Sequence, residues 1–273
     1  MEPWESWIGR TTTTEDALDP AQANRMAALL DREPTFAAGD SLPPAWHWLF
    51  FHDVARASQL GEDGHPQLGV TMPPVPLPRR MWAAGRLEFS RPLVLGTTVR
   101  RSSTFKSIVP KEGSTGALFF VTIQHDYSTS GEPNLTEEQT IVYREAPAVA
   151  KIPIATSAPA GAAITASWSM NRTALFRYSA LTSNGHRIHY DADYCRSVEG
   201  YPDVVVHGPL LATLLADLAF RNGRPLVTFS YRARSPLFVS QTFTVNGRVE
   251  GQTTHLWAAS GEGGLVMDAA AGG

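Results

Sequence analysis

Two short runs of the sequence carry residue types that perform proton chemistry. The first, 183-SNGHRIHYD-191, places His186 and His189 three residues apart, after Asn184. The second, 204-VVVHGPLLATLLADLAF-220, opens with His207 and Gly208 and continues as an apolar run. Histidine suits proton transfer because its unperturbed pKa is about 6.5. The two runs are compatible with a metal site, a hydrolase or an acid–base enzyme that uses one histidine.

The metal and hydrolase interpretations lack supporting residues. His186 and His189 could be zinc ligands on a helix, but Gly185 breaks the run and no third ligand is evident. The single cysteine, Cys195, excludes a site of several thiolates, and we expect it to be buried beside a helix. There is no G-x-S-x-G elbow for a serine hydrolase, and no Walker or dinucleotide glycine pattern.

Helix start and stop signals predict the elements around the two runs. Residues 209–222 form a predicted helix, because Pro209 suits a first helical turn and Asn222-Gly223 is a C-terminal stop. Leucines cover more than one face of this helix, which predicts that it is mostly buried. After the first run, "ADYCRSV" is predicted to be helical, with Asp191 as its N-cap.

The chain divides into two similar halves. The fragments "SRPLVLGTTV" at 90–99 and "RSPLFVSQTFTV" at 234–245 align, and each lies among segments with the alternation typical of strands. In the first half, 43–59 takes the place of the buried helix, while 149–163 is Ala- and Pro-rich and is predicted to be a linker. We therefore predict an α+β fold of two tandem hot-dog units, each a curled antiparallel sheet around a helix, over 1–148 and 164–273.

Composition excludes several other classes of protein. The 273 residues are 43% hydrophobic and 18% charged, which allows a sizeable core and argues against global disorder. A net charge of -3 gives no footprint for nucleic acid. No apolar run is long enough to span a membrane, and 1-MEPWESWIGR-10 is too acidic and too short for a signal peptide. We therefore expect a cytoplasmic protein.

The region 175-LFRYSALTSNGHRIHYDADYCRSVEGYPDVVVHGPLL-211 resembles the MaoC-like hydratase and dehydratase family of hot-dog enzymes. That family has a pattern close to S-G-D-x-N-P-x-H-x-D, then a short helix and an H-G-x-L helix start. The two motifs look most like the double-hot-dog branch, which includes 3-hydroxyacyl-thioester dehydratases and the hydratases for mesaconyl-C4-CoA and itaconyl-CoA. "PPAWHWLFF" and "MWAAGRLEF" in the first half also fit that branch.

One departure from the family pattern concerns the active histidine. Most members have Asp five residues before it, whereas this chain has Asn184, which cannot take a proton. The first half has Trp46 and His47 in place of the H-G helix start, and it has no H-x-D pair. We therefore expect one active site per chain, in the C-terminal unit, with a non-catalytic N-terminal unit that shapes the substrate-binding tunnel.

The resemblance assigns roles to three catalytic positions. Hydration of an enoyl thioester needs a base for water, an acid for the α-carbon and a donor for the thioester oxygen. His189 is the candidate that carries the proton. Asn184 would hold the water or fix the imidazole. The free N–H of Gly208, at the helix start, would form the oxyanion hole, and it has no side chain to block the carbonyl.

Three further positions are candidates for substrate binding. Leu210 would supply the next free N–H, since Pro209 has none. Arg187 is either an exposed charge or a clamp for a substrate carboxylate or CoA phosphate. His207 either contacts substrate or only packs against the helix. No metal is expected.

The predicted activity is a hydro-lyase that hydrates an enoyl-CoA, with mesaconyl-C4-CoA or itaconyl-CoA giving citramalyl-CoA as the favoured case. A fatty-acid-type 3-hydroxyacyl dehydratase acting on CoA or acyl-carrier-protein thioesters is the alternative. A thioesterase would need a carboxylate where Asn184 stands. A non-catalytic acyl-thioester binding subunit is the alternative of another class. The acyl-CoA substrate is the expected partner, no cofactor is expected, and monomer and homodimer both remain open.

Overall fold

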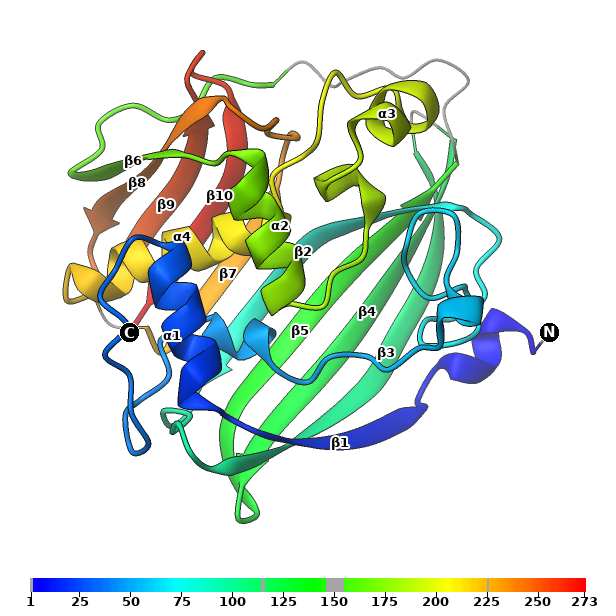
Figure 1. Ribbon diagram of the computed structural model, residues 1–273, viewed down its shortest axis with the longest axis horizontal. Coiled ribbons are helices and arrows are strands. Elements are labelled where there is room, and N and C mark those ends of the chain that lie inside the picture. The colour runs from blue at the N-terminus through cyan, green and yellow to red at the C-terminus, as the bar shows by residue number, and fades with distance from the viewer. Residues whose placement is uncertain (1, 114–115, 146–154, 225) are drawn as a thin grey trace.

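The structure, a computed structural model, describes residues 2–113, 116–145, 155–224 and 226–273. Among these residues, ten strands form one antiparallel sheet in the order β1-β3-β4-β5-β2-β7-β10-β9-β8-β6 (Figure 1). Read from one edge of the sheet the order is β1-β3-β4-β5-β2, and read from the other edge it is β6-β8-β9-β10-β7. Each strand of the first half thus has the same place as the strand numbered five higher in the second half. The two halves of the chain are therefore structural repeats.

The first half supplies β1 Thr11–Ala17, β2 Arg79–Phe89, β3 Thr98–Gly113, β4 Gly116–Thr129 and β5 Glu132–Arg144. The second half supplies β6 Ile164–Ser169, β7 Thr228–Ala233, β8 Thr242–Glu250, β9 Thr253–Ser260 and β10 Leu265–Gly272. The aligned fragments at 90–99 and 234–245 lie at the connections from β2 to β3 and from β7 to β8, so the predicted repeat is confirmed. Strands β2 and β7 pair at the centre and join the two halves into one sheet.

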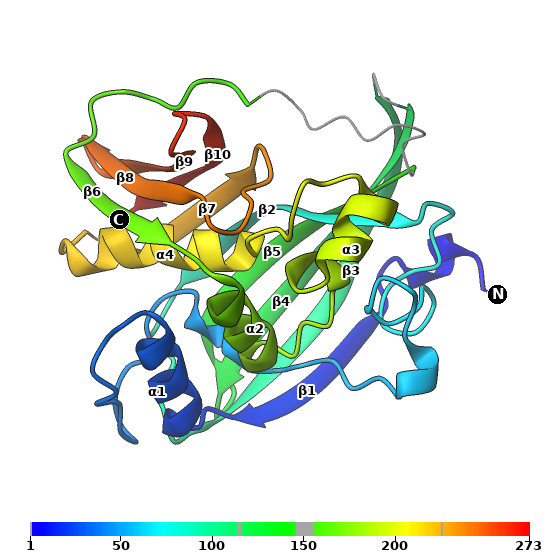
Figure 2. The ribbon, with the colours of Figure 1, turned by 45° about the horizontal axis from the view of Figure 1, so that its top comes forward.

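The predicted buried helix of the second half is α4, Gly208–Arg221. Every residue from Leu210 to Ala219 is buried, and the strands of the second half curl around the helix (Figure 2). The helix ends at Asn222, followed by Gly223 with a φ of 67°, a left-handed conformation that suits glycine. This half therefore has the predicted arrangement of a sheet wrapped around one apolar helix.

The predicted helix over 43–59 is wrong. In its place lie only short 3₁₀ turns at Trp46–Leu49 and Ala57–Gln59. Ala45 and Phe51 both have a left-handed backbone, with φ of 67° and 60°, so the helical path is interrupted on each side of the first turn. Buried aromatic side chains, such as those of Trp46 and Phe51, pack in the core here in place of a long helix.

The remaining helices are short and lie outside the curl of the second sheet. They are α1 Pro20–Leu29, α2 Arg172–Leu181 and α3 Ala192–Tyr194, and α1 packs against α2 (Figure 1). α3 continues as one π-helical segment, Cys195–Glu199, so the predicted helix in "ADYCRSV" is confirmed. The main core cluster surrounds α4 and reaches α1 and α2, and a second cluster lies under β3 and β4.

The connection between the halves runs from the end of β5 to the start of β6. Of the predicted linker, residues 149–154 lie outside the described residues. The described part contacts the β9–β10 turn, where the Leu265 N–H donates to Thr156 O at 2.7 Å. No helix in the described ranges is long and apolar enough to cross a membrane.

Candidate active site

A cavity of about 1160 Å³ lies between the two halves and takes its walls from both. The second half contributes Asn184, His186 and His189 from the histidine motif, and Gly208 from the start of α4. The first half contributes aromatic and polar side chains, among them Trp48 and Trp82. The cavity therefore brings together the two sequence motifs and the first-half segment that replaces a helix.

A hydrogen bond to the backbone fixes the orientation of the His189 ring. It ends the 3₁₀ turn Arg187–His189, and its Nδ1 lies 2.7 Å from the carbonyl oxygen of Val205. Because a carbonyl only accepts, the proton of the neutral ring must sit on Nδ1. Nε2 is left with its lone pair, and no hydrogen bond among the described residues uses it. His189 is thus arranged as a proton acceptor in the wall of the cavity.

The environment keeps His189 neutral. Burial lowers its pKa to about 4, against the opposing effect of the hydrogen bond to Val205. The imidazole is therefore uncharged at neutral pH. A neutral imidazole can take a proton from water and return it later, which is the behaviour that general acid–base catalysis requires.

His207 lies behind His189 rather than in the cavity wall. It is fully buried, its ring stacks on that of His189 at 3.6 Å and 17°, and its Nε2 lies 2.9 Å from Ser179 Oγ. Burial, and then the neighbouring His189, hold its pKa well below the usual value. The prediction that the His207 side chain binds substrate is not supported by this position; the ring packs against His189 and supports it.

Gly208 begins α4 and lines the cavity. The first N–H groups of a helix have no intrahelical acceptor, Pro209 has no N–H, and the Leu211 N–H already bonds to His207 O at 3.2 Å. The donors left are the backbone N–H groups of Gly208 and Leu210. The Leu210 side chain is fully buried and does not line the cavity, so any role of this residue rests on its backbone.

The absence of a side chain at Gly208 has a second cause. A Cβ there would lie 3.0 Å from Cε3 of Trp82, which comes from β2 in the first half. Trp82 in turn stacks on Tyr231 of β7, with ring centroids 4.1 Å apart. The start of α4 is therefore packed directly against the junction between the two halves, and glycine permits the close approach.

Asn184 lines the cavity but makes its polar contact within its own turn. Its Oδ1 accepts a hydrogen bond from the His186 N–H at 3.0 Å, and its N–H donates to Ser179 O at 2.9 Å. No hydrogen bond of the described residues links it to His189. Asn184 therefore stabilises the turn that leads into the histidine motif. Its side-chain amide nitrogen is the group left to contact a water or a substrate.

Arg187 is not free to clamp a substrate. Its Nε and Nη2 donate to Asp191 Oδ2 at 3.0 and 2.7 Å, its Nη1 donates to Glu62 O at 3.0 Å, and the guanidinium lies over the Tyr194 ring. Asp191 also accepts from the Tyr194 N–H at 2.9 Å, which confirms it as the N-cap of α3. Arg187 joins the histidine motif to α3 and to the first half.

A loop of the first half, Gly61–His65, docks on the histidine motif. The Arg187 N–H donates to Asp63 O at 2.8 Å, and Gly64 approaches Gly185 so closely that a Cβ on Gly64 would lie 1.9 Å from Gly185 O. The His65 and His186 rings lie 4.2 Å apart. Sequence reasoning missed this loop, because nothing in its local pattern marks it as a neighbour of residues more than a hundred positions away.

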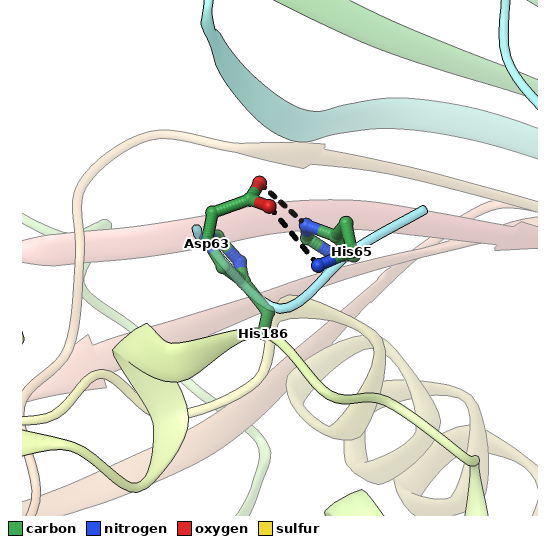
Figure 3. Close-up of side chains that lie close together, drawn as sticks. All are labelled: Asp63, His65 and His186. Atoms are coloured by element: carbon green, nitrogen blue, oxygen red, sulfur yellow. Dashed lines mark hydrogen bonds and ion pairs between the residues drawn. The ribbon is translucent and has the colours of Figure 1, made fainter. Parts of the chain in front are cut away.

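The docked loop brings Asp63 and His65 beside His186 (Figure 3). Their potential ligand atoms all lie within 4.8 Å of one another, so the absence of a third ligand, which argued against zinc, does not hold for His186. However, Arg80 Nε donates to His65 Nδ1 at 2.9 Å. The guanidinium charge opposes a metal cation at this place, against the attraction of the Asp63 carboxylate.

His65 Nδ1 has two competing neighbours. It lies 3.0 Å from Asp63 Oδ2 and 2.9 Å from Arg80 Nε. A ring nitrogen that accepts from Arg80 cannot at the same time donate to Asp63. The cluster therefore has two alternative hydrogen-bond arrangements, and a change of partner at Arg80 would switch between them.

The first-half wall of the cavity rests on a buried carboxylate. Glu137 is fully buried and bonds to His47 Nε2 at 2.9 Å, Trp48 Nε1 at 2.8 Å and Gln139 Nε2 at 2.7 Å. Burial alone would raise the pKa of Glu137, but His47 and the donated hydrogen bonds lower it to about 2. The Trp46–Leu49 turn is thus tied to β5 by polar contacts, in place of the helix expected there.

The histidine motif, the start of α4 and the Trp–His turn all fall in the region that matches a known family. A family model described as hydroxyacyl-thioester dehydratase type 2 matches residues 45–239. The chain belongs to this family. This confirms the resemblance seen in the sequence motifs.

Two curated relatives are similar over most of their length. The mesaconyl-C(4)-CoA hydratase of Chloroflexus aurantiacus is 44% identical over 270 residues, covering 97% of this chain and 96% of that protein. The mitochondrial hydroxyacyl-thioester dehydratase type 2 of Schizosaccharomyces pombe is 32% identical over 249 residues, covering 80% of each chain.

Solved structures share the architecture at lower identity. The crystal structure of HtdX from Mycobacterium tuberculosis has a TM-score of 0.67 at 17% identity and covers 96% of this chain and 98% of that chain. Another Mycobacterium tuberculosis protein, described as having a double hotdog fold, has a TM-score of 0.62 at 12% identity and covers 98% and 97%. The predicted double hot-dog fold is confirmed.

Proposed function

We propose that this protein is a hydro-lyase that reversibly hydrates an enoyl-CoA thioester, with mesaconyl-C4-CoA as the favoured substrate and citramalyl-CoA as the product. The observation that carries the proposal is the free Nε2 of His189, held by Val205 in the same cavity as the start of α4. The 44% identity to a mesaconyl-C(4)-CoA hydratase supports the choice of substrate. Itaconyl-CoA is the second substrate of the same class.

The residues divide the reaction between them. His189 Nε2 takes a proton from water as the oxygen attacks the β-carbon, and the imidazolium then delivers a proton to the α-carbon. The N–H groups of Gly208 and Leu210 stabilise the thioester oxygen as enolate character develops, with the α4 dipole adding to their effect. The Asn184 amide orients the water. In the reverse direction the same groups remove water from a 3-hydroxyacyl thioester.

The two halves take different parts in this proposal. Residues 164–273 supply the catalytic groups, and residues 1–148 supply the acyl-binding wall, joined by the linker at 149–163. We propose no cofactor besides the CoA of the substrate. A cytoplasmic location stays a prediction, as do the alternatives of monomer and homodimer.

A fatty-acid-type 3-hydroxyacyl-thioester dehydratase is the second candidate, because a relative of that name is 32% identical. The first-half wall of the cavity is mixed: it carries apolar side chains such as Phe105 and Ile123 beside polar ones such as His47 and Gln139. Because His47 and Gln139 already bond to Glu137, the preference for a short dicarboxylic acyl group rests on the higher identity to the mesaconyl-C(4)-CoA hydratase.

The test uses mesaconyl-C4-CoA and crotonyl-CoA, with enoyl-thioester absorbance and free thiol followed separately. We expect loss of absorbance without release of thiol, and faster turnover of mesaconyl-C4-CoA. Release of thiol would instead identify a thioesterase. If neither signal changes with either substrate, a non-catalytic acyl-thioester binding subunit replaces the proposal.

A further inference from the structure

Arg80 is a cation in the cavity wall that has no carboxylate at ion-pair distance among the described residues; Asp63, whose pKa is raised by burial against the lowering effect of Arg80, is connected to it through His65. It lies near the start of β2, is half-buried, and donates Nε to the neutral acceptor His65 Nδ1. By contrast, Arg79 pairs with Glu199, and Arg187 pairs with Asp191. A half-buried guanidinium that faces a cavity without a carboxylate partner is well placed to receive an anionic ligand.

A short series of rings connects Arg80 to His189. Arg80 contacts His65, His65 lies 4.2 Å from His186, and His186 lies 5.6 Å from His189 between ring centroids. His186 is buried in the cavity wall, and burial, His189 and then Arg80 lower its pKa to about 2. His186 therefore stays a neutral hydrogen-bond donor within the field of the Arg80 charge.

We propose that Arg80 and His186 bind the free carboxylate of a dicarboxylic acyl group. This inference rests on the proposed function and names the part of the substrate that the site recognises. In a mesaconyl C4-thioester the free carboxylate is attached to the β-carbon, which is the carbon that receives the hydroxyl group. A substrate whose β-carbon lies beside His189 must therefore place its carboxylate next to the same histidine, and His186 is the neighbouring polar group in the wall.

Three other wall arginines without an ion pair among the described residues, Arg10, Arg101 and Arg144, fit this role less well. Arg10 lies over the Trp7 ring at 4.4 Å, Arg144 lies beside Tyr201, and no hydrogen bond of the described residues joins either to the histidine motif. Arg101 lies over the Phe51 ring at 5.3 Å, and its neighbours are His125 and Tyr127, which come from β4 of the first half. No series of contacts like that of Arg80 joins it to the histidine motif among the described residues. Arg80 is thus the cation best placed beside the reacting carbon.

Binding of a carboxylate also resolves the conflict at His65. When Arg80 turns its N–H groups to the substrate, His65 Nδ1 loses its donor and can carry the proton that it then donates to Asp63, 3.0 Å away. Asp63 keeps a partner and the substrate gains one. In the absence of a carboxylate, Arg80 returns to His65, so the guanidinium is never left without an acceptor.

The proposal predicts that Arg80 discriminates between acyl groups. Arg80→Gln should lower kcat/KM for mesaconyl-C4-CoA by about 10²-fold or more, because a charged hydrogen-bonded contact is lost. For crotonyl-CoA, which has a methyl group and no carboxylate on the β-carbon, kcat/KM should stay within about threefold. Arg80→Lys should restore part of the activity with mesaconyl-C4-CoA. Arg86→Gln, on an exposed part of the same strand, serves as the matched control, since Arg86 forms a surface ion pair with Glu88 and does not line the cavity.

The outcomes separate this inference from the proposed function. If Arg80→Gln lowers kcat/KM equally for both substrates while the thermal midpoint is unchanged, Arg80 has a general role and the carboxylate assignment is wrong. Unchanged kinetics with both substrates also overturn it, and the hydratase stands. If the wild-type protein hydrates crotonyl-CoA and not mesaconyl-C4-CoA, the inference fails but the reaction class is retained. If it hydrates neither, both proposals fall.

Discussion

The replacement of His189 by asparagine tests the catalytic proposal with the least structural damage. Asparagine can still donate from its side-chain amide to Val205 O, which the imidazole reaches at 2.7 Å, but it cannot take a proton. Alanine would instead leave that buried carbonyl unpaired, at a cost of about 1–3 kcal/mol in stability. We expect His189→Asn to lower kcat about 10²–10⁴-fold, which corresponds to about 2.7–5.4 kcal/mol of transition-state stabilisation.

The pH dependence of wild-type kcat/KM tests the role of His189 independently of any substitution. With the pKa of His189 lowered to about 4 by burial, about 97% of the imidazole is neutral at pH 5.5, compared with about 9% for an unperturbed histidine. Because the neutral form is the base, kcat/KM for hydration should hold nearly level from pH 8 down to about 5. The acid limb should appear only near pH 4.

The assay is the initial rate of crotonyl-CoA hydration, with the folded fraction measured by circular dichroism at each pH. Crotonyl-CoA is used because it has no second carboxylate whose binding could add a separate pH dependence. An acid limb centred near pH 6.5, in protein that is still folded, would refute the assigned environment of His189. If His189→Asn keeps more than a tenth of the wild-type kcat, the proton transfer belongs to another group.

Substitutions at three further positions test the remaining parts of the site. Gly208→Ala places a Cβ at 3.0 Å from a tryptophan ring and beside the proposed oxyanion donor, so kcat/KM should fall by about 10²-fold with a smaller loss of thermal midpoint; unchanged activity per folded molecule would exclude the oxyanion role. Asn184→Asp keeps the acceptor for the turn and should keep measurable activity, whereas Asn184→Ala should lose most of it; steady-state kinetics equal to wild type for alanine would reduce Asn184 to a turn residue. Gly64→Ala should lower the unfolding free energy by about 2 kcal/mol or more, because its Cβ would meet Gly185 O at 1.9 Å and φ is +88°. Gly131 has a similar φ of +86° but open space around it, so Gly131→Ala is the matched control for backbone strain alone. Denaturant unfolding of both variants measures the difference.

The sequence predicted the parts of the site that depend on local pattern. The α4 boundaries follow from Pro209 and Asn222-Gly223, whose backbone preferences act within one helical turn. Asp191 caps the helix that begins after it, as predicted. The histidine motif and the start of α4 were expected to act together, and the structure places both on one cavity. These features needed little or no knowledge of long-range packing.

The missed parts depend on contacts between the halves. The Trp46–Leu49 segment has the apolar content of a buried helix, yet left-handed residues at Ala45 and Phe51 stop it after one turn. Glu137, which holds that turn, comes from a strand about ninety residues later, so no local pattern reveals the pairing. The same holds for His65 and Arg80, which reach the histidine motif only through the docking of a loop.

The β2–β7 seam has a consequence for how such a site can change over evolution. In a symmetric dimer of identical units, one substitution appears in both copies and alters the catalytic and the binding surface together. Here the seam joins two units that are encoded separately within one chain. A substitution at Arg80 therefore alters the first-half wall of the cavity once, without a matching change beside His189. If the two units have the proposed roles, substrate choice can diverge in one unit while the other keeps the proposed chemistry.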